Sequence, residues 1–358
     1  MRVAVLGPSR HPVAEPFAGG QESYVATLTT GLRARGHHVT LFAAPGSDPA
    51  LAHEVVEHPV LPRLSAVAAL DPQLPEPGFL RDQHAFLAVT DELLRRRHDI
   101  DVVHNNSLHH LPLAASRAIG IPLVTTLHTP PFPWMELGIE LCDPRATFVA
   151  VSDALASSWT SLPHPAVVIP SGVDASRFVR GDGGDDAVWV GRMVAEKGAD
   201  LAVQAATRAG RPLRLIGPMG DASWFDARVR PMLSGSTTYE GHRRHEETAN
   251  AVSGAALLLM TPRWEEPFGL VAVEAALTGT PVLALRRGGL AEVIDPQMGV
   301  LVDPRHNDEA TAQALADTVD EVASLSRSNV WASASRRFSV SAMIERYEQV
   351  YRQAMARW

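Results

Sequence analysis

The chain has 358 residues, more than one hydrophobic core usually contains, so we expect two domains. Hydrophobic residues make up 46% and charged residues 20% of the sequence, a balance that excludes disordered, fibrous and low-complexity proteins. The net charge of -8 argues against a general nucleic-acid binder, which is normally basic.

The chain start and the single cysteine give an expectation about location. Polar residues from Gly7 onward interrupt the first apolar stretch too early for a signal peptide, and no stretch approaches the roughly 20 apolar residues of a membrane span. Cys142 is the only cysteine, so no internal disulfide can form. We expect a cytoplasmic protein in which Cys142 packs as a small hydrophobic side chain.

Short apolar runs alternate with helical patterns in the first half of the chain. Strands are predicted at residues 3–6, 39–43, 102–104, 123–127 and 148–151, and helices at 22–35, 83–97 and 111–119. This alternation predicts a parallel sheet covered by helices on both faces. Several prolines between residues 57 and 80 indicate an irregular loop, either at the surface or facing the second half.

The pattern restarts after Pro163. Strands are predicted at 167–169, 187–190, 213–216, 256–260, 281–284 and 299–302, and helices at 199–209, 246–253, 270–277 and 308–325. We therefore predict two doubly wound α/β domains, residues 1–165 and 166–340, with a hinge near 163–172. A last helix is predicted at residues 341–356.

Residues 263–275, RWEEPFGLVAVEA, follow a predicted strand and open a helix near Leu270. The free N–H groups of such a helix start bind an anionic diphosphate readily. Glu266 and Glu274 flank this start, where their carboxylates can grip hydroxyl groups on either side of the diphosphate. The alternative is an amphipathic helix with incidental solvated glutamates. The amides concerned belong to Phe268, Gly269, Leu270 and Val271.

Two cations follow the predicted strand at 187–190. Arg192 offers a planar fork for phosphate oxygens, whereas Lys197 offers a mobile point charge. Together they can neutralise a leaving diphosphate without a metal. An ordinary exposed loop is the alternative.

In the first half, Gly19 and Gly20 precede a helix, and paired glycines let backbone amides approach an anion closely. A flexible turn is the alternative. The first strand lacks the Gly-x-Gly-x-x-Gly pattern of nicotinamide dehydrogenases. His128 follows the strand at 123–127, at the edge where ligands gather, although a structural or merely exposed histidine is the commoner case.

His104 ends an earlier strand in the same way as His128 follows its own. With His109 and His110 it raises the question of a metal site. No carboxylate or cysteine completes convincing ligand spacing, so no metal is expected.

Together these segments resemble the retaining glycosyltransferases of the GT-B architecture, in the large family 4-like group that includes sucrose-synthase-like enzymes and bacterial mannosyl- and glucosyltransferases. The family's hallmark is two glutamates separated by seven residues, as Glu266 and Glu274 are. Ser171 and Ala291 replace a usual asparagine and a frequent proline. Other matching pieces occur in the family's order: 19–20, 169–174, 191–192, 196–198, 279–282 and 288–293.

The resemblance implies two Rossmann-like domains facing a central cleft, with a last helix at about 341–358 packing back onto the first. It implies that Glu274 holds the ribose and Glu266 the donor sugar. It also implies that Arg192 and Lys197 bind the diphosphate, together with amides at 268–271 and at Gly20. The catalytic residues implied are His128, Arg192, Lys197 and Glu266.

On this resemblance, we expect transfer of a hexose from a nucleoside-diphosphate sugar to an acceptor hydroxyl, with retention of the anomeric configuration and without metal or cofactor. UDP is favoured over GDP because it is the family's commonest carrier. The acceptor is a small molecule, a glycan or a lipid-linked sugar. High alanine, arginine and proline content indicates a GC-rich bacterial source.

Two other functions remain open from the sequence: a GT-B sugar-nucleotide epimerase and a non-catalytic nucleotide-sugar-binding protein. Arg95, Arg96 and Arg97 raise peripheral membrane contact as a further option. The acidic net charge disfavours it.

Overall fold

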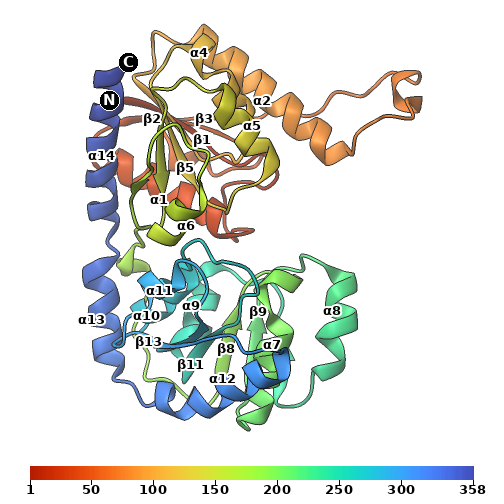
Figure 1. Ribbon diagram of the computed structural model, residues 1–358, viewed down its shortest axis with the longest axis vertical. Coiled ribbons are helices and arrows are strands. Elements are labelled where there is room, and N and C mark those ends of the chain that lie inside the picture. Colours follow the sequence, from red (N-terminus) through yellow and green to blue (C-terminus); the bar gives the residue numbers. More distant parts are fainter. The chain divides into compact units, whose positions relative to one another are not determined.

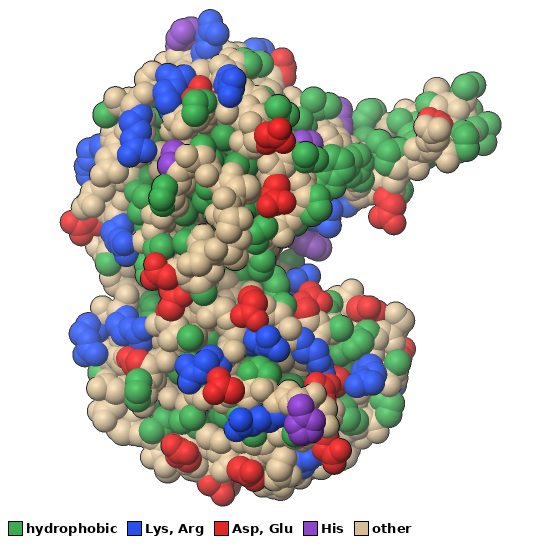
Figure 2. Space-filling view, in the orientation of Figure 1, with side chains coloured by type: hydrophobic (Ala, Val, Ile, Leu, Met, Phe, Trp, Pro, Cys, Tyr) green, Lys and Arg blue, Asp and Glu red, His purple; other side chains and the backbone are tan.

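The computed structural model describes residues 1–358, which divide into two compact units. Unit 1 comprises Met1–Val151, Ala156–Ile169 and Ile344–Trp358, and unit 2 comprises Ser152–Leu155 and Pro170–Met343. Each unit contains one parallel sheet with helices packed around it (Figure 1). On the face drawn in Figure 2, cations and carboxylates are interspersed over both units.

Unit 1 has a seven-stranded sheet in the order β3-β2-β1-β4-β5-β6-β7. Its strands are β1 (Arg2–Leu6), β2 (His38–Ala43), β3 (Glu54–Glu57), β4 (Val102–Asn105), β5 (Leu123–Leu127), β6 (Thr147–Ala150) and β7 (Val167–Val168). The central strands are buried along almost their whole length because helices cover both faces. The strand order reverses between β1 and β4.

The helices of the first sheet are short except for two. They are α1 (Gly20–Ala34), α2 (Pro77–Arg95), α3 (Leu111–Ala114), α4 (Ser116–Ile119) and α5 (Pro133–Leu141). Helix α6 (Asp153–Ser158) is divided between the units, with its residues up to Leu155 in unit 2 and the rest in unit 1. The last helix of the chain, α14 (Val340–Arg357), contributes the part from Ile344 onward to unit 1.

Unit 2 has a six-stranded sheet in the order β10-β9-β8-β11-β12-β13, and its order reverses between β8 and β11. Trp189 of β8 lies in a core that α7 and α12 cover. The strands are β8 (Ala187–Val190), β9 (Leu213–Ile216), β10 (Thr237–Tyr239), β11 (Leu257–Met260), β12 (Val282–Leu285) and β13 (Gly299–Val302). The helices are α7 (Ala199–Arg208), α8 (Ala222–Arg228), α9 (His245–Ser253), α10 (Leu270–Leu277), α11 (Leu290–Val293), α12 (Asp308–Ala323) and α13 (Arg327–Arg337).

Most predicted elements are present within a few residues, but the strand predicted at 167–169 was assigned to the wrong sheet. Its central pair, Val167–Val168, is β7 and pairs with β6 in unit 1. A two-residue edge strand has no periodicity that tells which sheet it joins. The helix predicted at 111–119 is divided into α3 and α4 at Ala115.

A buried polar network joins α14 to the first sheet. The Tyr347 hydroxyl lies 2.9 Å from Thr126 Oγ1 and also contacts the hydroxyl of Tyr24. His104 Nε2 lies 2.7 Å from the same Thr126 Oγ1, and its Nδ1 lies 2.6 Å from the hydroxyl of Tyr351. Burial lowers the pKa of His104 to about 3, so its imidazole is neutral. His104 is therefore an interior packing residue.

Glu348 of α14 ties the same helix to the end of α1. Its carboxylate accepts hydrogen bonds from Arg35 at 2.9 and 3.1 Å, and one of its oxygens lies 2.9 Å from His37 Nε2. The Arg35 hydrogen bonds lower the pKa of Glu348 to about 2 against the opposing effect of burial. The ionised carboxylate thus stabilises the folded unit.

We predict that Glu348→Gln lowers the free energy of unfolding of unit 1 by about 2 kcal/mol at neutral pH, after discounting for the exposed arginine partner. Because the pKa is lowered in the folded state, this stabilisation is present above the unfolded pKa of about 4.5 and is lost as the pH falls towards 2. Urea denaturation at several pH values measures it. Glu345→Gln, an exposed carboxylate of the same helix, is the control, and equal effects of the two variants would contradict the prediction.

Candidate functional site

Two loops of unit 2 begin at the same edge of its sheet. Residues 191–198 follow β8, and residues 261–269 follow β11. Because β8 and β11 are parallel neighbours at the point where the strand order reverses, both loops leave from their carboxyl ends. In open α/β sheets, ligands bind at this position.

Close backbone packing holds the two loops together. Gly198 has φ of +70°, and a Cβ on it would lie 2.0 Å from the carbonyl oxygen of Thr261. Thr261 Oγ1 donates a 2.7 Å hydrogen bond to the Gly198 carbonyl, and the Arg263 amide donates a 2.8 Å hydrogen bond to the Glu196 carbonyl. Glycine is therefore required at position 198 both by conformation and by space.

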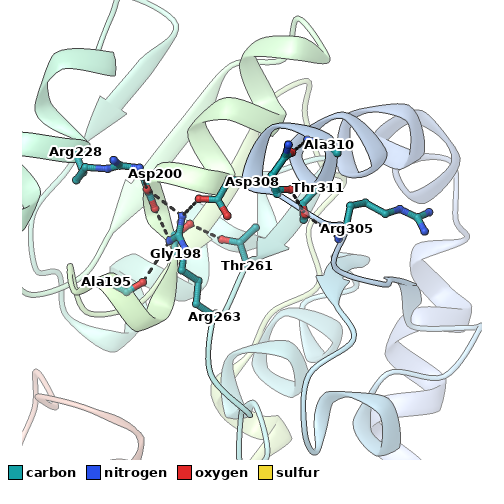
Figure 3. Close-up of polar contacts among 11 residues, drawn as sticks. Ala195, Gly198, Asp200, Arg228, Thr261, Arg263, Arg305, Asp308, Ala310 and Thr311 are labelled. Atoms are coloured by element: carbon teal, nitrogen blue, oxygen red, sulfur yellow. Dashed lines mark hydrogen bonds and ion pairs between the residues drawn. The ribbon is translucent and has the colours of Figure 1, made fainter.

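A bidentate ion pair reinforces this packing (Figure 3). The Arg263 guanidinium contacts the two carboxylate oxygens of Asp200 at 2.6 and 3.0 Å, and the Asp200 side chain is only 2% exposed. Arg263 also contacts Asp308 at 2.8 Å, while Arg228 lies 3.4 Å from Asp200. Asp200 and Arg263 are 63 positions apart, and no local sequence pattern predicts that they pair.

The predicted site residues Lys197 and Glu266 meet at this edge. Lys197 Nζ lies 2.7 Å from Glu266 Oε2, and the side chains are 23% and 12% exposed. Trp264 Nε1 donates a 2.9 Å hydrogen bond to the same oxygen, and Lys197 Nζ lies 4.7 Å from the centre of the Trp264 ring. Trp264, to which the sequence pattern gives no role, contacts both charged groups at once.

The loop after β12 fixes the backbone around Glu266. The Gly289 amide donates a 2.8 Å hydrogen bond to the Glu266 carbonyl, and the Gly288 amide donates a 2.6 Å hydrogen bond to the Glu265 carboxylate. A Cβ on either glycine would lie 2.4 Å from a backbone oxygen of residue 266 or 267. The glycine pair recognised in the sequence is thus a site of close backbone approach.

Helix α10 begins next to Glu266 without a side-chain cap. Its N-cap is Gly269, with φ of +94°, and no side chain accepts a hydrogen bond there. Leu270 and Val271 are its first residues, while the Phe268 side chain is buried and packs against Phe338. The helix start therefore presents main-chain amides and the positive end of the helix dipole.

Glu274 is the fifth residue of α10. The side chain is partly exposed, but its carboxyl group lies among protein atoms. This burial raises its pKa to about 7, and the positive charge of Arg177 opposes the shift. At neutral pH this carboxyl group is therefore partly protonated.

Arg192 lies on the same loop as Lys197, but its side chain is 49% exposed and its guanidinium lies 3.8 Å from the Glu196 carboxylate. The structure thus brings Lys197 and Glu266 into contact. Arg192 and Glu274 belong to segments at the same sheet edge, but Arg192 pairs with Glu196, and the charged group that acts on Glu274 is Arg177.

In unit 1, His128 follows β5 and contacts a residue that the sequence analysis missed. Its Nε2 lies 3.0 Å from Asn106 Oδ1, which can only accept, so Nε2 carries the proton. Tyr24 packs edge-on against the imidazole at 4.7 Å, and Gln21 donates a hydrogen bond to the Asn106 carbonyl. Burial lowers the pKa of His128 to about 3, so the ring is neutral.

Gly19 is the N-cap of α1 and Gly20 is its first residue, again with no side-chain cap. The φ of Gly19 is -170°, which any residue can adopt, and a Cβ there would make an ordinary 3.4 Å contact with Glu22. Nothing within unit 1 therefore demands glycine at position 19.

The described residues form neither a metal-binding cluster nor a membrane-spanning helix. No three histidine, cysteine, aspartate or glutamate side chains are grouped so as to hold a metal ion, and His109 stacks against Phe86 and His110. None of the helices is both long and apolar enough to cross a membrane.

Comparison with known proteins places the chain among glycosyltransferases. Residues 18–177 match Glycosyltransferase Family 4, and residues 184–321 match Glycosyl transferases group 1. A D-inositol 3-phosphate glycosyltransferase of Mycolicibacterium smegmatis is 30% identical over 402 residues, covering 99% of this chain and 92% of the relative. A glycogen synthase of Mycobacterium tuberculosis is 29% identical over 373 residues, covering 91% and 88%.

Solved structures share the fold over nearly the whole chain. The sucrose-phosphate synthase of Thermosynechococcus elongatus is similar with a TM-score of 0.74, at 22% identity and 99% coverage of both chains. Anabaena HepE, solved with UDP and glucose, has a TM-score of 0.75 at 19% identity and covers 97% of this chain and 98% of its own. These findings confirm the GT-B fold predicted from the sequence. The chain belongs to glycosyltransferase family 4 and is a glycosyltransferase.

Proposed function

We propose that the chain transfers a hexose from UDP-sugar to an acceptor hydroxyl, with retention of the anomeric configuration and without a metal ion. The observation that carries this proposal is the contact of Lys197, Glu266 and Trp264 beside the uncapped start of α10. A cation, a carboxylate and free main-chain amides at one sheet edge match the charges of a sugar diphosphate.

The diphosphate is assigned to the start of α10. Helix N-termini bind anions through free N–H groups and the helix dipole. Lys197 supplies a fixed positive charge there, and Arg192 can reach the same anion because its exposed pair with Glu196 is weak. Positive charge placed where the leaving diphosphate gains negative charge is the largest expected contribution to catalysis. This is why the proposal requires no metal.

Glu266 is assigned to the donor sugar. Lys197 and Trp264 both contact its Oε2, which orients the carboxylate and leaves Oε1 to accept a hydrogen bond from a sugar hydroxyl. The arriving diphosphate competes with Glu266 for Lys197. In this proposal, the ion pair keeps both charges positioned until the donor joins them.

Glu274 is assigned to the ribose. Two ribose hydroxyls donate to the ionised form of a carboxylate, so donor binding is expected to lower the raised pKa of Glu274. His128, with a neutral ring and its proton on Nε2, is proposed to act in turnover from unit 1. The amides of Gly19 and Gly20 are proposed to approach the donor, since the unit itself does not require glycine at position 19.

Names of similar proteins support the donor class. Anabaena HepE has been solved with UDP and glucose and with UDP-glucose. The curated relatives include glycogen synthases and inositol-phosphate glycosyltransferases, so we propose a glycan or polyol hydroxyl as the acceptor. The single buried cysteine fits a reducing compartment, and we propose a cytoplasmic location.

Lys197→Ala is expected to weaken UDP binding on the order of 10- to 100-fold, because one charge-assisted phosphate contact contributes roughly 1.5–3 kcal/mol. Isothermal titration with UDP measures this change, and turnover of UDP-glucose is measured separately. Arg211→Ala is the matched control, since Arg211 is paired with Asp320 before β9, at the other end of the strand. Unchanged UDP affinity in Lys197→Ala would remove the donor-site assignment.

Glu274→Gln is expected to weaken UDP binding while stabilising the free protein at alkaline pH. The folded state disfavours the ionised form, so this penalty is absent below the unfolded pKa of about 4.5 and complete above about 7. The variant should gain on the order of 2–3 kcal/mol near pH 8 and almost nothing near pH 4. Thermal denaturation across pH tests the stability, and a pH-independent difference would exclude burial of this carboxyl as its cause.

The stereochemical assignment predicts that an α-linked donor gives an α-linked product. Proton NMR of the product formed from UDP-glucose and an accepted sugar distinguishes the two anomers. The control is donor incubated without acceptor, which should not yield a rearranged sugar. A β-linked product would refute retention while leaving the donor site intact.

A further inference from the structure

Exposed apolar side chains are concentrated on two segments of unit 1. One is residues 59–76, here called the arm, and the other is α5. Figure 2 shows hydrophobic side chains along the arm and around its base. Seven large hydrophobic residues of these segments are exposed: Val60, Val67, Leu70, Leu74, Trp134, Leu137 and Leu141. Monomeric proteins rarely leave such a group uncovered, and it commonly marks an interaction surface.

The arm is anchored at both ends but has little internal support. His58 precedes it and is buried, and Phe79 follows it and packs against Trp134 at 5.6 Å. Between these anchors the arm projects from the rest of unit 1, and its only regular element is one short turn, Ala68–Leu70 (Figure 1). Val67 and Leu70 are 83% and 82% exposed, so the arm gains almost nothing from the core of its own chain.

The exposed residues of α5 form one stripe. Trp134, Leu137 and Leu141 are spaced as i, i+3 and i+7, which places them on one face of the helix. The opposite face is fixed: Met135 and Ile139 are buried, and a Cβ on Gly138 would lie 2.9 Å from the backbone of His110. The helix cannot turn to bury its apolar stripe.

The charges of the two segments favour a protein over a bilayer as the occupant. The arm contains one cation, Arg63, and the carboxylates Asp71 and Glu76, while α5 adds Glu136 and Glu140. Anionic membrane surfaces attract segments rich in lysine and arginine and repel this set. Glu140 follows Leu137 by three residues and therefore lies at the edge of the stripe. An arm lying across the stripe brings Arg63 within reach of the Glu140 carboxylate.

We propose that two copies of the chain associate, with the arm of each lying across the α5 stripe of the other. Such a two-fold arrangement forms every contact twice, so one apolar arm and one apolar stripe per chain are sufficient. The arm and the exposed residues of α5, which exclude the buried Met135, Gly138 and Ile139, together fall within the roughly 20–30 residues per side of a standard interface. The ion pair expected across it joins Arg63 to Glu140 of the partner subunit.

Sedimentation velocity of the full chain over a range of concentrations tests the association. Wild type is expected to form dimers, and Val67→Asp combined with Leu70→Asp, or Leu137→Asp alone, is expected to shift it to monomer. Circular dichroism checks that the variants fold. Val179→Asp is the matched control, since Val179 is 74% exposed but lies in unit 2. A monomeric wild type, or dimers that survive both sets of changes, would overturn the proposal.

A charge exchange tests the specific pairing. Arg63→Glu and Glu140→Arg should each weaken dimerisation, and the double variant should restore it, because each partner then carries the reversed charge. If the double variant did not regain dimerisation, the pairing of Arg63 with Glu140 of the partner subunit would be refuted. Flotation with phosphatidylglycerol-containing vesicles tests the alternative occupant. Vesicle binding that the Val67→Asp and Leu70→Asp changes abolish would assign the arm to a bilayer and overturn the proposal.

Discussion

Lys197 and Glu266 lie 2.7 Å apart although 69 positions separate them in the chain. They meet because β8 and β11 are neighbouring parallel strands at the reversal of the second sheet, so the loops that follow them share one edge. Every assignment at the donor site depends on this juxtaposition. The sheet order supplies the position, and the start of α10 supplies uncapped amides beside it.

The residues that hold the two loops together are not the residues proposed to bind the donor. Arg263 forms a bidentate pair with the nearly buried carboxylate of Asp200, and removing Arg263 would leave that charge with only the longer contact to Arg228. Glu274 shows the opposite balance, because its carboxyl group is buried with an elevated pKa. The ion pair thus holds the two loops together, whereas the folded protein disfavours the ionised form of Glu274, the group proposed to bind the ribose.

The sequence was sufficient to predict the alternation of strands and helices, the loops that carry Lys197 and Glu266, and the helix that carries Glu274. These depend on local periodicity, on glycine at turns and on short motifs. It could not predict that β7 joins the first sheet or that Arg263 pairs with Asp200, because both are long-range contacts. Trp264 lies inside the main motif, yet its contacts with Lys197 and Glu266 depend on how the two loops fold together. The exposure of Val67 and Leu70 likewise required the fold, since apolar residues are more often buried.

The central claim concerns where the diphosphate binds, and a crystal structure of the chain with UDP-glucose tests it most directly. The account predicts phosphate oxygens at the amides of Leu270 and Val271, with Lys197 Nζ within hydrogen-bonding distance and Glu266 contacting the sugar. A diphosphate bound at any other edge, with Lys197 and Glu266 still paired only to each other, would contradict it.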